Sequence, residues 1–103
     1  MKYCMIEVAF ASEQEVHQAV NELLKSKLVC GAQIVKADSK WRWEDKIELC
    51  PEYLAFLKTK KSLVKEVYDV IRTIHSYECF EFAEFPMDSC YQEYLDWIDE
   101  ETK

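Results

Sequence analysis

Glycine, proline and histidine are scarce in this chain of 103 residues, and each shortage argues against a class of structure or chemistry. With Gly31 as the only glycine, and two prolines, long flexible linkers are not expected and a glycine-rich phosphate loop cannot be built. His17 and His75 are the only histidines. They leave little material for a nucleophilic centre, which needs a base and usually a third orienting group. We therefore expect a regular domain that is not an enzyme.

Positive charge and long apolar runs are also missing. Twenty acidic residues against thirteen basic ones give a formal net charge of −7, which repels phosphate backbones and argues against a nucleic-acid partner. No apolar run approaches the length that spans a bilayer, so no membrane partner is expected. The segment Met1–Glu7 reaches an acidic residue too early for a signal peptide. These features predict a cytoplasmic protein.

The cysteines lack the spacing of a metal or disulfide framework. Their number is odd, and no pair is separated by two residues as in zinc knuckles and iron–sulfur sites. We expect five free thiols, mostly packed as small apolar groups: Cys4, Cys30, Cys50, Cys79 and Cys90.

Aromatic residues, in contrast, are abundant. Three Trp, six Tyr and five Phe stand in a chain that is half apolar. The length suits one domain over residues 1–103 with one core. A small monomer buries so many large rings with difficulty, which favours a subunit interface that covers some of them.

The first half of the chain has the pattern strand, helix, strand. Lys2–Phe10 alternates apolar and mixed positions, as in a strand with one buried face. Ser12 and Glu15 have capping-box spacing and predict the start of a helix. Cys30–Ala37 is extended, and the alternation then resumes, which predicts a long bent strand ending near Glu44-Asp45.

The second half repeats this order and adds a closing helix. Pro51 lies within its first strand and cannot donate to a sheet ladder, so it marks an edge position or a bulge. The charged tip and this proline suggest that the outer half of the hairpin projects beyond the sheet. The predicted elements are a strand, a helix, a strand and a helix over Lys46–Lys58, Ser62 to His75-Ser76, Glu78–Phe85 and Tyr91–Glu101.

Two β-α-β units favour a ferredoxin-like α+β sandwich, with one antiparallel sheet and both helices on one face. The other face of the sheet then stays bare. Tyr3, Met5 and the hairpin aromatics would be exposed there unless another subunit covered them. Because a large exposed apolar patch usually marks an interface, this fold also predicts self-association.

Several motifs, in this order, resemble the CutA family of small trimeric proteins linked to divalent-ion tolerance. The most specific is the hairpin tip, where the family carries an aromatic-Trp-Glu-Gly-Lys-Ile pattern. The matching segments are Lys27-Leu28, Arg42-Trp43-Glu44-Asp45-Lys46-Ile47, Leu57-Lys58-Thr59, His75-Ser76-Tyr77-Glu78 with Glu81, and Glu93-Tyr94-Leu95-Asp96-Trp97-Ile98. The resemblance covers nearly the whole chain and implies a trimer with a protruding hairpin.

The chain departs from the family at several positions. Gly31 stands at a family cysteine, and Asp45 replaces the turn glycine. In some members copper has been placed on a cysteine and a histidine pair, at the positions of Ala9, Ile74 and His75. The resemblance therefore leaves His75 as the one contact for copper or another divalent cation. The alternative is that His75 caps its helix and bonds a backbone carbonyl.

A cleft between subunits is the second site that the resemblance and the element ends imply. It would be lined by Glu44, Lys58, Tyr77, Glu78 and Glu81. Opposed charges beside a tyrosine can orient a small polar molecule. The same residues would equally serve as an interfacial salt-bridge network, so both interpretations stay open.

The resemblance thus implies a homotrimer whose hairpin reaches a neighbour, with Trp41, Trp43, Lys46 and Trp97 at the interface. It implies a non-enzymatic protein associated with tolerance of divalent cations such as copper, binding an ion or small ligand in the cleft. The alternative is a metal-independent trimeric regulatory or scaffold protein that binds a metabolite or a partner protein.

Overall fold

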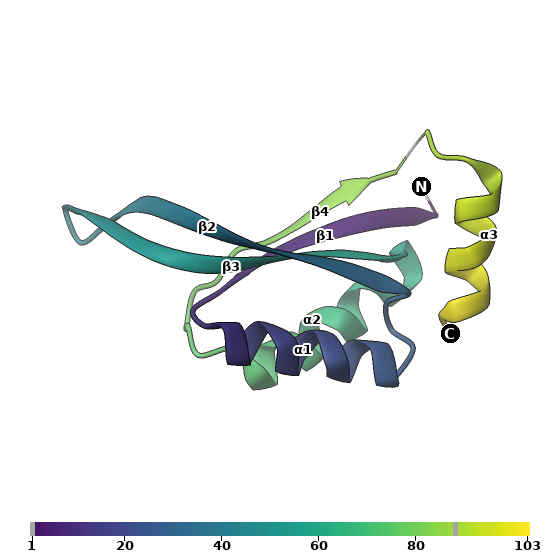
Figure 1. Cartoon of the computed structure of the whole chain (residues 1–103), viewed down its shortest axis with the longest axis horizontal. Coiled ribbons are helices and arrows are strands. Elements are labelled where there is room, and N and C mark those ends of the chain that lie inside the picture. Colours follow the sequence, from purple (N-terminus) through teal and green to yellow (C-terminus); the bar gives the residue numbers. More distant parts are fainter. Residues whose placement is uncertain (1, 88) are drawn as a thin grey trace.

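The computed structural model describes residues 2–87 and 89–103 and contains four strands and three α-helices (Figure 1). The strands form where apolar residues alternate, and the helices form where they recur every three to four positions. A short 3-10 turn, η1 (Lys61–Leu63), leads into the second helix. In chain order the other elements are β1 (Tyr3–Phe10), α1 (Glu13–Lys25), β2 (Gly31–Trp43), β3 (Lys46–Lys60), α2 (Val64–Ile74), β4 (Phe82–Pro86) and α3 (Gln92–Glu101).

The strands form one antiparallel sheet in the order β2-β3-β1-β4. The register of β1 on β3 runs from Tyr3 opposite Lys60 to Phe10 opposite Tyr53. Helices α1 and α2 lie together on one face of the sheet (Figure 1). This confirms the predicted single antiparallel sheet and leaves the second face, the open face, without these helices.

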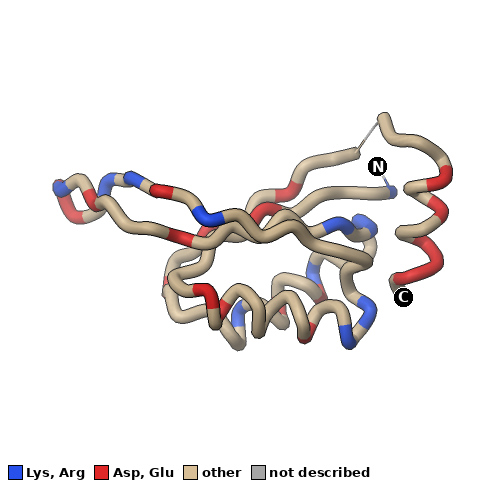
Figure 2. Tube along the Cα trace, in the orientation of Figure 1, with Lys and Arg blue, Asp and Glu red and all other residues tan. Residues whose placement is uncertain are grey.

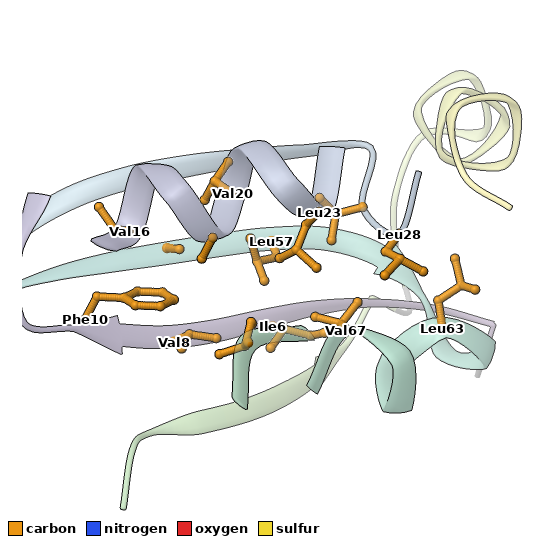
Figure 3. Close-up of a cluster of buried hydrophobic side chains, with 14 of the residues drawn as sticks. Ile6, Val8, Phe10, Val16, Val20, Leu23, Leu28, Leu57, Leu63 and Val67 are labelled. Carbon is orange, nitrogen blue, oxygen red and sulfur yellow. The ribbon is translucent and has the colours of Figure 1, made fainter. Parts of the chain in front are cut away.

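The core lies between the sheet and the two helices (Figure 3). Alternate residues of β1 point into it, while the residues between them lie on the open face. Full burial of each large aliphatic side chain contributes about 1.5–3 kcal/mol relative to exposure. Completely buried members include Ile6, Val8, Val16, Leu23, Val67 and Ile71.

The outer part of the β2–β3 hairpin extends beyond the rest of the sheet, as predicted (Figure 1). Pairing of β3 with β1 stops at Tyr53, whereas pairing with β2 continues to Trp43 opposite Lys46. We call residues 38–51 the arm and the remainder of the domain the body. The chain is elongated as a result, with extents of 45 × 26 × 21 Å.

Pro51 occupies an edge position, one of the two predicted alternatives: β1 pairs with β3 only as far as Tyr53, and the β2–β3 register passes Pro51 without a bulge. Two other predicted details of the second half need correction. Ser62 does not begin the α-helix, because it sits in η1 and no side chain caps α2. The fourth strand is not Glu78–Phe85 but Phe82–Pro86, since the Phe80 ring turns to stack on His75 and holds the preceding segment outside the ladder.

Helix α3 covers the end of the open face that is remote from the arm. Its Ile98 is fully buried, and Tyr3 Oη donates a hydrogen bond of 2.6 Å to Asp99 Oδ2. A Cβ atom at Gly31 would lie only 3.2 Å from Cη2 of Trp97. The glycine at this strand position therefore permits the close approach of the indole ring.

The five thiols are all free, but only two of them are buried as small apolar groups. Burial raises the pKa values of Cys4 and Cys30 to about 11. Cys79 and Cys90 are exposed, so the prediction of mostly packed thiols is wrong for them. Among the helices of the described residues, none has the length and apolar character needed to cross a membrane.

Candidate functional site

A groove of about 830 Å³ lies where the arm joins the body. The strands of the arm form one wall, and the segment that leads into β4 forms the other. The groove brings together five residues that the sequence predicted for the interface or cleft: Trp41, Trp43, Tyr77, Glu78 and Glu81. Its other lining residues are Ala9, Ser39, Lys40, Arg42, Glu48, Glu52 and Cys79.

Glu52 and Glu81 line this groove, and Glu7 lies beside Glu81 on the open face. We call Glu7, Glu52 and Glu81 the acidic triad. A hydrogen bond with Glu7, together with burial, raises the pKa of Glu81 to about 7, and the charge of Glu52 adds to this effect.

Tyr77 completes this network from the loop after α2. Its hydroxyl donates a hydrogen bond of 3.0 Å to Glu52 Oε2. Burial, followed by this hydrogen bond, raises the pKa of Tyr77 to about 12, so the phenol stays protonated. Glu52 is only 7% exposed. Within residues 2–87 and 89–103, no lysine or arginine forms an ion pair with the acidic triad.

His75 ends α2, and its side chain is completely buried. The ring stacks between Phe10 and Phe80, with centroid distances of 4.7 and 4.3 Å. Its Nε2 lies 2.6 Å from the carbonyl oxygen of Ala9, and its Nδ1 accepts a hydrogen bond of 3.1 Å from the Tyr77 N–H. Because a carbonyl only accepts, Nε2 carries the proton and Nδ1 is the acceptor in the neutral ring.

Both ring nitrogens of His75 are therefore engaged, and neither offers a free lone pair to a metal ion in this arrangement. The positions that the family resemblance linked to copper do adjoin each other. Ala9, however, contributes only its carbonyl oxygen. In the part of the chain that the structure describes, no three His, Cys, Asp or Glu side chains converge as ligands. Metal contact through His75 stays a prediction.

Two predicted cleft residues lie outside the groove of the single chain. Glu44 occupies the turn at the tip of the arm, with a positive φ of 49°. Lys58 lies on the body, where its Nζ donates to Gln33 Oε1 at 2.8 Å and to the Phe56 carbonyl at 3.2 Å. Burial lowers the pKa of Lys58.

Glu7 and Glu52 are the site residues that the sequence reasoning missed. Each is a charged residue inside a predicted strand. Glu7 has the opposite parity to the apolar face of β1, so it lies on the open face. An acidic residue at such a position was the available signal, but its partners lie on other strands and cannot be found by local periodicity.

A model of the CutA1 divalent ion tolerance protein family matches residues 4–101. The chain belongs to this family. The CutA divalent-cation tolerance protein of Archaeoglobus fulgidus is 33% identical over 95 residues, which cover 92% of this chain and 93% of that protein. CutA of Pyrococcus horikoshii is 30% identical over 99 residues, which cover 96% and 97% of the two chains.

Solved CutA structures share the same fold over almost the whole chain. The periplasmic divalent cation tolerance protein CutA from Archaeoglobus fulgidus superposes with a TM-score of 0.96 at 31% identity, covering 98% of this chain and 99% of that one. CutA1 from Pyrococcus horikoshii superposes with a TM-score of 0.92 at 29% identity, covering 97% and 98%. The family names refer to cation tolerance and not to a catalysed reaction.

Proposed function

We propose that this CutA family member is a non-enzymatic, cytoplasmic homotrimer of ferredoxin-like subunits associated with tolerance of divalent cations such as copper. In this proposal the groove at the base of the arm becomes a cleft between subunits and holds an ion or a small polar ligand. Trp41, Trp43, Lys46 and Trp97 lie at the contacts between copies.

The exposed apolar surface of the arm carries this proposal. Trp43 is 53% exposed, Leu49 64% and Ile47 73%. Three large apolar side chains on a projecting two-stranded ribbon are costly in water and are typical of a surface that another chain covers. Both arm strands also have no further strand beside them within the described chain, and pairing with a neighbour is one way to protect such edges.

The geometry of His75 supports a second candidate, a metal-independent trimer that binds a metabolite or a partner protein. With both ring nitrogens engaged, His75 serves as a structural link between α2 and β1. In this alternative the groove and its carboxylates recognise an organic ligand, and the cysteines bind soft metals only adventitiously.

Light scattering coupled to gel filtration tests the assembly, and a monomer at micromolar concentration would contradict it. Calorimetric titration of the reduced protein with copper(I) and zinc under a competing chelator tests ion binding.

His75→Gln is the informative variant for ion binding, because an amide can still donate to the Ala9 carbonyl and accept from the Tyr77 N–H. Submicromolar binding that this variant abolishes would establish His75 as a ligand. Binding lost only in Glu81→Gln would place the ion in the groove. No binding above that of the thiols would favour the metal-independent protein.

A further inference from the structure

The open face carries two charged groups of opposite sign that form no ion pair within the described part of the single chain. At the body end, Lys58 is bonded only to the neutral oxygens of Gln33 and Phe56. At the arm end, the acidic triad has the hydrogen bond from the Tyr77 hydroxyl and the one between Glu81 and Glu7, and no cation of the described chain beside it. Within residues 2–87 and 89–103, neither group takes part in an ion pair with an opposite charge.

The sheet register keeps these two groups apart. Lys58 of β3 is opposite Met5 of β1, whereas Phe82, which follows Glu81, is opposite Val8. Lys58 and Glu81 are therefore separated by four residues, about 13 Å, along the strand direction, and by two further strand spacings across the sheet. Glu7 lies nearer, on the diagonal position of β1, but the Lys58 ammonium points to Gln33 on the opposite neighbouring strand. In the single chain Lys58 therefore does not pair with any member of the acidic triad.

The pKa values of both groups are shifted in the direction expected of a partly buried charge without an opposite charge beside it. Burial lowers the pKa of Lys58, and it helps to raise that of Glu81. Partly buried charges of this kind destabilise a structure unless an opposite charge joins them. A small cation in the groove would compensate the acidic triad and leave Lys58 as it is. A second copy of the chain compensates both.

We propose that Lys58 of each copy inserts its ammonium group among the acidic triad of a neighbouring copy, so that each groove is completed by its neighbour. The inference rests on the proposed trimer and assigns the cleft charges to an ion-pair network between subunits. Because donor and acceptor lie at opposite ends of one face, successive copies associate head to tail, and in the proposed trimer three such contacts close a ring.

The surroundings of Lys58 fit this docking. Lys58 is opposite Gly31, and Gly31 is the residue that Trp97 of α3 approaches. A copy that places Lys58 at the groove therefore also brings α3 to its neighbour's arm. Helix α3 carries only acidic charge, whereas the arm carries charges of both signs (Figure 2). The residues that could pair are Glu93, Asp96, Asp99, Glu100 and Glu101 on α3 with Lys40, Arg42 and Lys46 on the arm, which also holds Asp38, Glu44, Asp45 and Glu48.

A charge-reversal cycle tests the pairing. Dissociation constants of the trimer are measured by concentration-dependent light scattering for the wild type, Lys58→Glu, Glu81→Lys and the double variant. We expect each single variant to weaken association by about tenfold or more, because it leaves like charges facing each other. The double variant should regain most of that loss, since every interface again pairs one cation with the acidic site. Lys25→Glu and Glu13→Lys, both on the exposed surface of α1, are the matched controls and should leave association unchanged.

Two outcomes would overturn the inference, and they differ in what else they affect. If the wild type forms a trimer but the two single effects simply add in the double variant, the pairing is wrong while the proposed assembly stands. If the wild type is a monomer at micromolar concentration, the proposed assembly fails and the pairing fails with it. Circular dichroism of each variant separates loss of association from loss of the fold, and milder variants, Lys58→Met with Glu81→Gln, provide the same cycle without like-charge contacts.

Discussion

The body and the arm are two halves of one sheet with opposite surroundings. In the body, Leu57 and Ile71 are at most 1% exposed, and two helices cover the sheet (Figure 3). In the arm, Ile47 and Leu49 are each more than 60% exposed, and two strands stand without any helix above them (Figure 1). The core of the body is complete within a single chain, whereas most apolar residues of the outer arm are not covered by their own chain.

This difference separates folding from assembly. The packing that specifies the body lies within one copy, so substitutions there should lower the stability of the subunit itself. The arm gains little from its own chain, and its apolar residues should act mainly through contacts between copies. An arm substitution that lowers subunit stability as much as a core substitution does would contradict this distinction.

The largest effect is expected in the core. Ile71→Ala removes a fully buried side chain of α2 and should reduce the free energy of unfolding by about 3 kcal/mol, because it leaves a cavity. Guanidinium unfolding at a fixed protein concentration measures the change. Leu49→Ala on the arm is the comparison, and an equal loss of subunit stability there would contradict the division into body and arm.

Trp43→Ala should act next most strongly, and on assembly. Truncation of a buried interface aromatic often costs about 2 kcal/mol or more in binding free energy, so this variant should release subunits at micromolar concentration. Light scattering measures the mass, with Leu24→Ala on α1, another partly exposed apolar residue, as the control. A Trp43→Ala trimer as stable as the wild type would show that this ring is not at the interface.

His75 distinguishes a structural role from a metal-binding role. His75→Phe keeps the ring stacking but leaves the Ala9 carbonyl and the Tyr77 N–H without partners, at a cost of about 1–3 kcal/mol in unfolding free energy. His75→Gln retains both hydrogen bonds and should lose less. Thermal unfolding of the apoprotein compares the two. Equal stability of His75→Phe and wild type would remove the structural role.

The pairing of Lys58 with the acidic triad predicts a pH dependence of association. In the free chain Glu7 of β1 and Glu52 of β3 face Glu81, and the pKa of Glu81 is raised to about 7. An ammonium from a neighbour lowers this pKa, so association releases a proton. The trimer should therefore be stabilised as the pH rises toward 7 and weakened as it falls below.

Trimer dissociation constants measured across this range check the sign, and Glu81→Gln should flatten the profile. Weaker association as the pH approaches 7 from below would contradict the pairing.

The smallest effect is expected at the tip of the arm. Glu44 and Asp45 form a two-residue turn with φ values of 49° and 65°, a conformation that favours asparagine and glycine. The double variant that combines Glu44→Asn with Asp45→Gly should stabilise the hairpin by about 1 kcal/mol. Thermal unfolding measures the gain, and a destabilised double variant would indicate that the native side chains make contacts outside the turn.

Local patterns were sufficient to predict most of the fold. The alternation in Lys2–Phe10, the N-cap at Ser12 and the projecting hairpin are confirmed. The other half of the predicted capping box is wrong, because the Glu15 carboxylate accepts a hydrogen bond from the Ser76 N–H. The start of β4 was misplaced because residues 78–81 alternate like a strand, whereas in the structure Phe80 stacks on His75 and the strand begins only at Phe82. A periodic pattern predicts which face of an element a residue occupies, but it does not predict which side chains from other elements contact that residue.

The site was predictable only in part for the same reason. Tyr77, Glu78 and Glu81 are close in sequence and were identified together, and they do line one groove. Glu52 reaches Tyr77 across 25 residues of sequence, and Glu7 reaches Glu81 from another strand. Such contacts follow from the strand order and register, which had to be known before these residues could be grouped.

Hydrogen exchange of the arm amides tests the central claim most directly. In a lone chain the amides of residues 38–51 are held only by a two-stranded ribbon and should exchange much faster than those of β1. If neighbouring copies cover the arm, its amides should show protection similar to the body at micromolar concentration and lose it on dilution or in Trp43→Ala. Rapid exchange of the arm beside a protected body, unchanged by concentration, would contradict the claim that other copies cover it.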